Sequence, residues 1–185
     1  MEGHLEFITA DLNSWEPVAK YDAIIANQSL HHMLNLEDLF EGIRRALEPE
    51  APFVISDMIG RNGHLRWPEA RAIVDEFWRR LPPSYRFNRA LRRFEERFED
   101  SDCSGEGFEG IRSQDILPLL KRMFHFEYFF GFANVIDPFV DRAFGYDFDA
   151  NEPWVRRLID EIHARDEAEQ LAGKITSTHM LAIVT

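Results

Sequence analysis

Three segments near the start of the chain, LEFITADLN (5–13), YDAIIANQSLHHM (21–33) and PFVISDMIG (52–60), decide the fold. Each holds a short run of apolar residues that is continuous rather than alternating, which predicts strands buried on both faces, as in a parallel sheet covered by helices. The predicted strands are Leu5–Ile8, Asp22–Ala26 and Pro52–Ser56. Between the last two, apolar residues repeat at helical spacing from Leu36 to Leu47. Strand, helix and strand in this order predict an α/β fold with a right-handed crossover.

The composition is that of an acidic globular protein. Hydrophobic residues make up 45% and charged residues 29% of the 185 residues, which suits a single domain. The 21 basic and 33 acidic side chains leave a net charge of −12, which opposes binding to nucleic acid or to an anionic membrane. The single cysteine, Cys103, excludes an internal disulfide. Because we find no signal peptide and no long apolar segment, we expect a cytoplasmic protein.

Past residue 60 the pattern becomes mainly helical. A helix is predicted to begin at Pro68, and residues 84–99 are predicted to be helical for much of their length. Glycines and acids in residues 100–110 predict a loop. The later predicted elements are a helix from Ser113 to Phe124, a strand from Phe126 to Ile136, a helix after Asn151 and a strand over the closing HMLAIVT. We interpret residues 1–185 as a single domain in which residues 66–110 form a cap or insertion.

The order and spacing of these motifs resemble the class I S-adenosylmethionine-dependent methyltransferases that act on small molecules. ADLN (10–13), SLHH (29–32) and PFVISD (52–57) resemble the end of the third strand, the loop after the fourth strand, and the fifth strand of that family. The resemblance implies a Rossmann-like methyltransferase sheet with a helical insertion after the fifth strand. Because no glycine-rich turn precedes these segments, the fold is expected to be N-terminally truncated.

The resemblance also implies a cofactor, S-adenosylmethionine, and residues that bind it. Asp11 would accept a hydrogen bond from the adenine amino group, and Leu12 would pack on the adenine ring. Asn27 and Gln28 would lie near the methionine portion, at the carboxyl end of a strand, where open α/β sheets bind their ligands. The alternative for Asp11 is that it only begins a turn, as aspartate often does.

The candidates for catalysis and for substrate binding follow two of the predicted strands and a double-proline turn. His31 or His32 could orient the cofactor or act as general base on a substrate hydroxyl. The alternative is a loop with one buried and one exposed histidine. Adjacent histidines alone do not define a metal site, so none is predicted. Asp57 is expected to face the substrate, and Tyr85 and Arg86 to contact it; the alternative for this pair is ordinary helix packing.

The predicted activity is methylation, the transfer of a methyl group from S-adenosylmethionine to a small-molecule acceptor by in-line displacement. The alternative is a non-catalytic fragment of this fold that acts as an oligomerisation or interaction module. The family's sheet order is 3-2-1-4-5-7-6, so the strand at Asp22–Ala26 would lack its neighbour on one side. An open apolar edge invites pairing, which predicts a homodimer or a complementing chain at that edge. A hydrolase is not supported, since no GxSxG turn occurs.

Overall fold

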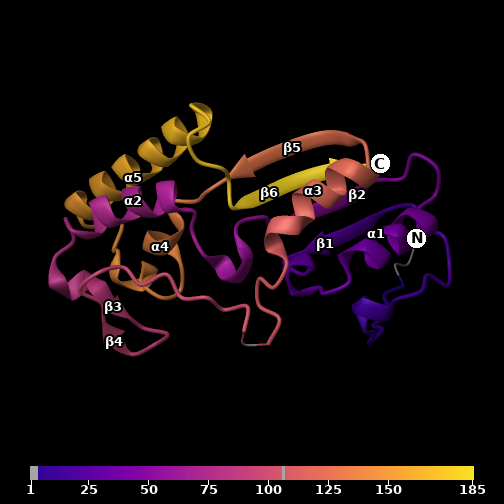
Figure 1. Ribbon diagram of the computed structural model, residues 1–185, viewed down its shortest axis with the longest axis horizontal. Helices are drawn as coiled ribbons and strands as arrows, with labels where there is room; N and C mark the ends of the chain where they lie inside the picture. The colour runs from indigo at the N-terminus through magenta and orange to yellow at the C-terminus, as the bar shows by residue number, and fades with distance from the viewer. Residues whose placement is uncertain (1–3, 106) are drawn as a thin grey trace.

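A four-stranded mixed sheet forms one end of the molecule. The computed structural model describes residues 4–105 and 107–185 of the chain. The strands are β1 (Ile24–Asn27), β2 (Phe53–Met58), β5 (Phe126–Phe132) and β6 (His179–Val184). Their order in the sheet is β1-β2-β6-β5, as Figure 1 shows. β1 runs parallel to β2, whereas β6 is antiparallel to both β2 and β5.

This order agrees with the 4-5-7-6 half of the order that the resemblance implies. The strands predicted around residues 22–26, 52–56 and 179–185 are confirmed, and the sheet is of the mixed α/β type. The strand predicted at Leu5–Ile8 is wrong: these residues have no regular structure, and Phe7 is 89% exposed. No strand in the described part of the chain pairs with this run, so its exposed backbone groups are left to hydrogen-bond with water instead of forming a ladder.

Two helices cover one face of the sheet. They are α1 (Leu36–Ala46), which confirms the predicted helix, and α3 (Ser113–Met123). Alternate strand residues point into the core that these helices close, among them Phe53 and Ile55, neither of which is exposed. The strand residues between these point to the opposite face of the sheet. Large apolar side chains on that face remain exposed: Ile25 (73%), Tyr128 (48%), Phe130 (52%) and Leu181 (40%). The expectation of strands buried on both faces is therefore wrong.

A second core lies in a helical lobe at the left of Figure 1, away from the sheet. The lobe contains α2 (Pro68–Trp78), α4 (Asp137–Val140), α5 (Pro153–Leu171) and the hairpin of β3 (Phe87–Asn88) and β4 (Arg93–Phe94). Residues 66–110 thus pack together with later helices. Among the described helices, none is long and apolar enough to cross a membrane.

The helix predicted over residues 84–99 is wrong. The chain forms the 3-10 helix η4 (Pro83–Arg86) and then the β3–β4 hairpin. The guanidinium group of Arg86 donates to the carbonyl oxygens of Leu81 (2.6 Å) and Glu96 (3.1 Å). The contact with Glu96 joins the two arms of the hairpin, a pairing that helical periodicity does not reveal.

Candidate functional site

One buried carboxylate fastens the loop after β1 to the end of β2. Asp57 has no solvent-exposed surface. Its Oδ2 accepts hydrogen bonds from the backbone N–H groups of Ser29 and Leu30, both at 2.8 Å. Its Oδ1 accepts from the Met58 N–H at 2.8 Å and is 2.6 Å from His31 Nδ1. Asp57 therefore fixes the position of His31 in the 3-10 helix η2 (Leu30–His32).

The ionisation of Asp57 decides which nitrogen of His31 carries the proton that is donated to it. Burial acts to raise the pKa of Asp57, but the hydrogen bonds from His31, Ser29 and Leu30 outweigh it, so the pKa is lowered. A carboxylate only accepts hydrogen bonds, so we assign the donated proton to His31 Nδ1. The sequence led us to expect Asp57 at the substrate side; the structure places it beneath His31, without exposed surface.

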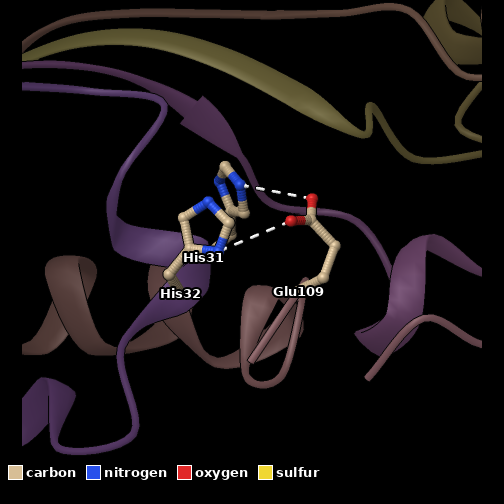
Figure 2. Close-up of side chains that lie close together, drawn as sticks. All are labelled: His31, His32 and Glu109. Carbon is tan, nitrogen blue, oxygen red and sulfur yellow. Dashed lines mark ion pairs between the residues drawn. The ribbon is translucent and has the colours of Figure 1, made fainter. Parts of the chain in front are cut away.

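Two further side chains converge on the histidine pair. Figure 2 shows ring nitrogens of His31 and His32 directed at the two oxygens of the Glu109 carboxylate. His31 Nε2 is 3.7 Å from Glu109 Oε1, and His32 Nδ1 is 3.5 Å from Oε2. His64, in the 3-10 helix η3 (Asn62–His64), brings Nε2 to 2.7 Å from Glu109 Oε1. The His32 and Glu109 side chains are 38% and 33% exposed, so the cluster is open to solvent.

The surroundings of Glu109 stabilise its ionised form. Burial acts to raise the pKa of Glu109, but the hydrogen bond from His64 and the nearby histidines outweigh it and lower the pKa. Burial lowers the pKa of His64, and Glu109 opposes that shift. Glu109 is therefore an anion that faces imidazole nitrogens at neutral pH.

The turn that carries Glu109 is anchored to the histidine loop through the backbone. The Ile111 N–H donates to the His31 carbonyl at 3.1 Å, and the Gly63 N–H donates to the Gly110 carbonyl at 2.9 Å. Gly110 has a φ of +63°, and a Cβ there would lie 2.9 Å from His64 Cε1. Only glycine suits that backbone and that close approach. The turn is thus built to bring Glu109 beside the histidines.

An ion pair secures the chain directly after this turn. The two terminal nitrogens of the Arg112 guanidinium, Nη1 and Nη2, donate to the Glu37 carboxylate oxygens at 2.6 and 2.8 Å. The hydrogen bond from Arg112 lowers the pKa of Glu37 to about 2. Glu37 belongs to the first turn of α1, so the pair joins α1 to the start of α3. The site is thereby linked to the core of the sheet.

Sequence reasoning missed Glu109 and His64. It treated residues 100–110 as a loop and did not single out His64. The only signal in the sequence was a carboxylate next to Gly110, in a segment where glycines recur. Neither residue lies near His31 along the chain, so only the fold brings them together.

The residues expected to bind the cofactor lie at the surface. Asp11 precedes the 3-10 helix η1 (Leu12–Ser14), and Leu12 is 37% exposed. Asn27 and Gln28 are exposed at the carboxyl end of β1, where Gln28 has a φ of +49°. Asn13, next to Leu12, accepts from the backbone N–H groups that follow the histidine pair, those of Leu34 (2.8 Å) and Asn35 (3.2 Å). The ADLN segment therefore lies against the loop that carries His31 and His32.

Tyr85 and Arg86 are not brought to the histidines. They lie in η4, directly before β3, in the lobe at the left of Figure 1. The Tyr85 ring packs against those of Phe148 and Trp154, with centroids 5.5 and 4.8 Å apart. The Arg86 guanidinium is held by backbone carbonyls. These contacts favour the packing interpretation over a substrate contact.

A shallow depression of about 300 Å³ lies elsewhere, at the amino end of β2. Its lining includes Lys20, Pro49, Ala51 and Thr185. The histidine cluster lies at the opposite, carboxyl end of the parallel strands, which is the end where open α/β sheets bind ligands. We place the candidate site there because buried and charged groups converge at that end.

The comparisons with known proteins add one structural similarity. No family model matches the chain, and no curated protein is similar to it in sequence. A solved structure that is similar is that of an S-adenosylmethionine-dependent methyltransferase from Mesorhizobium loti, with a TM-score of 0.43 and 14% sequence identity. The alignment covers 95% of this chain and 67% of that one.

Proposed function

We propose that the chain transfers a methyl group from S-adenosylmethionine to a small-molecule acceptor. The observation that carries the proposal is the buried Asp57–His31 pair at the carboxyl end of β2, in a sheet of the order β1-β2-β6-β5. That order is the 4-5-7-6 half of the sheet that the resemblance implies, and the carboxyl end is where such sheets bind ligands. In this pair, His31 Nε2 is directed toward Glu109 and the partly exposed side of the cluster, where an imidazole could accept a proton from the acceptor.

The residues of the ADLN segment fit the adenine end of the cofactor. The hydrogen bonds that the Asp11 side chain makes within the described residues, to the Asn13 backbone and side-chain nitrogens, all use Oδ1. Oδ2 is left to accept from the adenine amino group, and exposed Leu12 is available to cover the ring. Asn27 and Gln28 would meet the methionine portion. When bound, S-adenosylmethionine supplies an electrophilic methyl group on a positively charged sulfur.

The chain's own contribution is alignment and the handling of the acceptor's proton. The acceptor would lie beside His31 and His32, on the exposed side of the cluster. His31 is held rigidly by Asp57, so its outward nitrogen keeps one position relative to an acceptor oxygen. Holding two reactants in line is the main source of rate enhancement in such a displacement.

Asp11→Ala is expected to weaken binding of S-adenosylhomocysteine, the demethylated cofactor, by about 10- to 150-fold, or 1.5–3 kcal/mol. The reason is that the variant loses the charged acceptor for the adenine amino group. Isothermal titration of wild type and variant measures the change. Asp22→Ala, which removes an exposed aspartate just before β1, is the matched control and should bind as wild type does. Equal affinity in all three proteins would remove Asp11 from the site, and no binding to wild type at millimolar ligand would contradict the proposed function.

A second candidate function is an oligomerisation module, and the open edge of β1 favours it. In the described part of the chain, β1 is paired with β2 on one side alone, and Ile25 in this strand is 73% exposed. An apolar strand edge can pair antiparallel with the same edge of a second copy, which generates a two-fold dimer. A second copy is therefore the partner that we propose for this edge.

Ile25→Lys is expected to convert a dimer of the chain into a monomer. The added charge would be repeated across the two-fold axis and would lie in the apolar contact. Light scattering at micromolar concentration measures the mass. Val18→Lys, at a position that is 90% exposed and outside the strand, is the control and should stay dimeric. A monomeric wild type, or a dimer that Ile25→Lys leaves intact, would rule this interface out.

A further inference from the structure

Ring nitrogens of His31 and His32 face the two oxygens of the Glu109 carboxylate at more than hydrogen-bond distance. His31 Nδ1 is engaged with Asp57, so Nε2 is the ring nitrogen left to meet a ligand. That nitrogen points at Glu109 Oε1 across 3.7 Å, and His32 Nδ1 points at Oε2 across 3.5 Å. Both separations exceed the 2.7–3.2 Å range of a nitrogen–oxygen hydrogen bond. Two imidazole nitrogens and a carboxylate held at these distances can coordinate one cation between them.

We propose that His31, His32 and Glu109 bind a divalent transition-metal ion, with Zn²⁺ as the best match. Their ligand atoms all lie within 4.8 Å of one another. Tetrahedral zinc with bonds of about 2 Å places neighbouring ligand atoms about 3.3 Å apart, close to the separations seen here. Two imidazoles and one carboxylate form a ligand set that zinc takes at open sites, whereas Mg²⁺ and Ca²⁺ prefer oxygen ligands alone.

The surroundings of these ligands match those of a metal site. A metal-binding histidine usually donates its other ring N–H to a carboxylate, as His31 does to Asp57. His64 Nε2, at 2.7 Å from Glu109 Oε1, orients the carboxylate or offers a further ligand. The backbone hydrogen bond between Ile111 and His31 holds the two ligand-bearing loops together. The site is thus preorganised before any ion arrives.

The role of the ion rests on the proposed function, although its binding does not. With three protein ligands and a solvent-open side, the ion keeps a coordination position for an oxygen of the acceptor. His31 Nε2 is then a ligand of the ion and no longer takes the acceptor's proton. Instead, a hydroxyl bound to the ion loses its proton to solvent more readily, because the ion stabilises the resulting oxyanion. The acceptor class would then be small molecules whose methylated atom is a hydroxyl or carboxyl oxygen.

The test is titration of Zn²⁺ into untagged, chelator-treated protein in competition with a chromophoric chelator. We expect one Zn²⁺ per chain and no measurable Mg²⁺ binding. Glu109→Gln and His32→Ala should each raise the Kd for Zn²⁺ by about 100-fold or more. Loss of a residue that only supports a ligand typically costs about 10- to 100-fold in metal affinity, and loss of the ligand itself should cost at least as much. His163→Ala on α5 removes an exposed histidine paired with Glu167 and is the matched control, expected to bind as wild type does.

Loading with Co²⁺ gives an independent readout, since its visible spectrum reports the ligands. Nitrogen ligation should give bands that shift in His32→Ala and stay unchanged in His163→Ala. Melting temperatures without metal establish that each variant is folded; His32 and Glu109 are partly exposed, so their loss should leave the fold intact. The proposal is overturned if wild type binds no Zn²⁺, or if Glu109→Gln and His32→Ala bind it as tightly as wild type does. Zinc binding without binding of S-adenosylhomocysteine would support the metal site and count against methyl transfer. Binding of S-adenosylhomocysteine without zinc binding would support methyl transfer and overturn the metal site.

Discussion

Asp57→Ala is expected to destabilise the protein by about 4 kcal/mol, which is a large part of the stability of an ordinary domain. The substitution leaves the backbone N–H groups of Ser29, Leu30 and Met58 without their acceptor. It also leaves His31 Nδ1 without its partner at a buried position. Each unsatisfied buried donor costs about 1–3 kcal/mol, and partial relaxation keeps the total below the simple sum.

Urea denaturation followed by circular dichroism measures this loss. Asp57→Asn is expected to cost about half as much, because its amide oxygen can still accept while its NH₂ group faces the donors that Asp57 had satisfied. The control is Glu16→Ala, which breaks an exposed ion pair with Arg45 and should cost less than about 1 kcal/mol. A loss below 1 kcal/mol for Asp57→Ala would mean that the carboxylate does not hold the histidine loop.

Trp78→Ala is expected to cost about 4 kcal/mol through the second core. Trp78 is 1% exposed, and its ring contacts those of Phe98 and Phe144, with centroids 5.4 and 4.8 Å apart. Its Nε1 donates to the Glu95 carbonyl at 3.3 Å, which ties α2 to the β3–β4 hairpin. Removing the indole leaves a large cavity and an unpaired carbonyl.

The same urea experiment, read by tryptophan fluorescence and circular dichroism together, tests this prediction. Phe7→Ala is the control, since Phe7 is 89% exposed and its loss should stay within about 0.5 kcal/mol of wild type. Trp78→Ala that is as stable as Phe7→Ala would contradict the packing of the helical lobe.

Local pattern was enough for several elements of the fold. Examples are the strands around Ile24 and Phe53 and the helix from Leu36. The spacing of apolar residues that predicts each of them lies entirely within one short segment of the sequence. The same reasoning failed where a partner elsewhere decides the outcome. Leu5–Ile8 is apolar yet pairs with no described strand, and residues 87–94 form a hairpin whose two arms Arg86 joins by donating to the Glu96 carbonyl.

The candidate site divides in the same way. His31 and His32 could be selected from the sequence because they follow a strand in a recognisable motif. Their contacts with Asp57, Glu109 and His64 could not be predicted from the sequence, because nothing in it indicates which distant residues will meet in the fold.

The sequence by itself therefore determined the strands around residues 22–26, 52–56 and 179–185, the helix from Leu36, the acidic charge and the histidine pair after β1. These depend on residue type and on short-range spacing, which the chain carries before it folds. The tertiary structure alone decided that Asp57 lies under His31, that Glu109 faces both histidines, and that one face of the sheet stays open. The physical reason is that burial and the pairing of charged groups depend on contacts between distant segments, and such contacts exist only once the sheet and its helices have assembled.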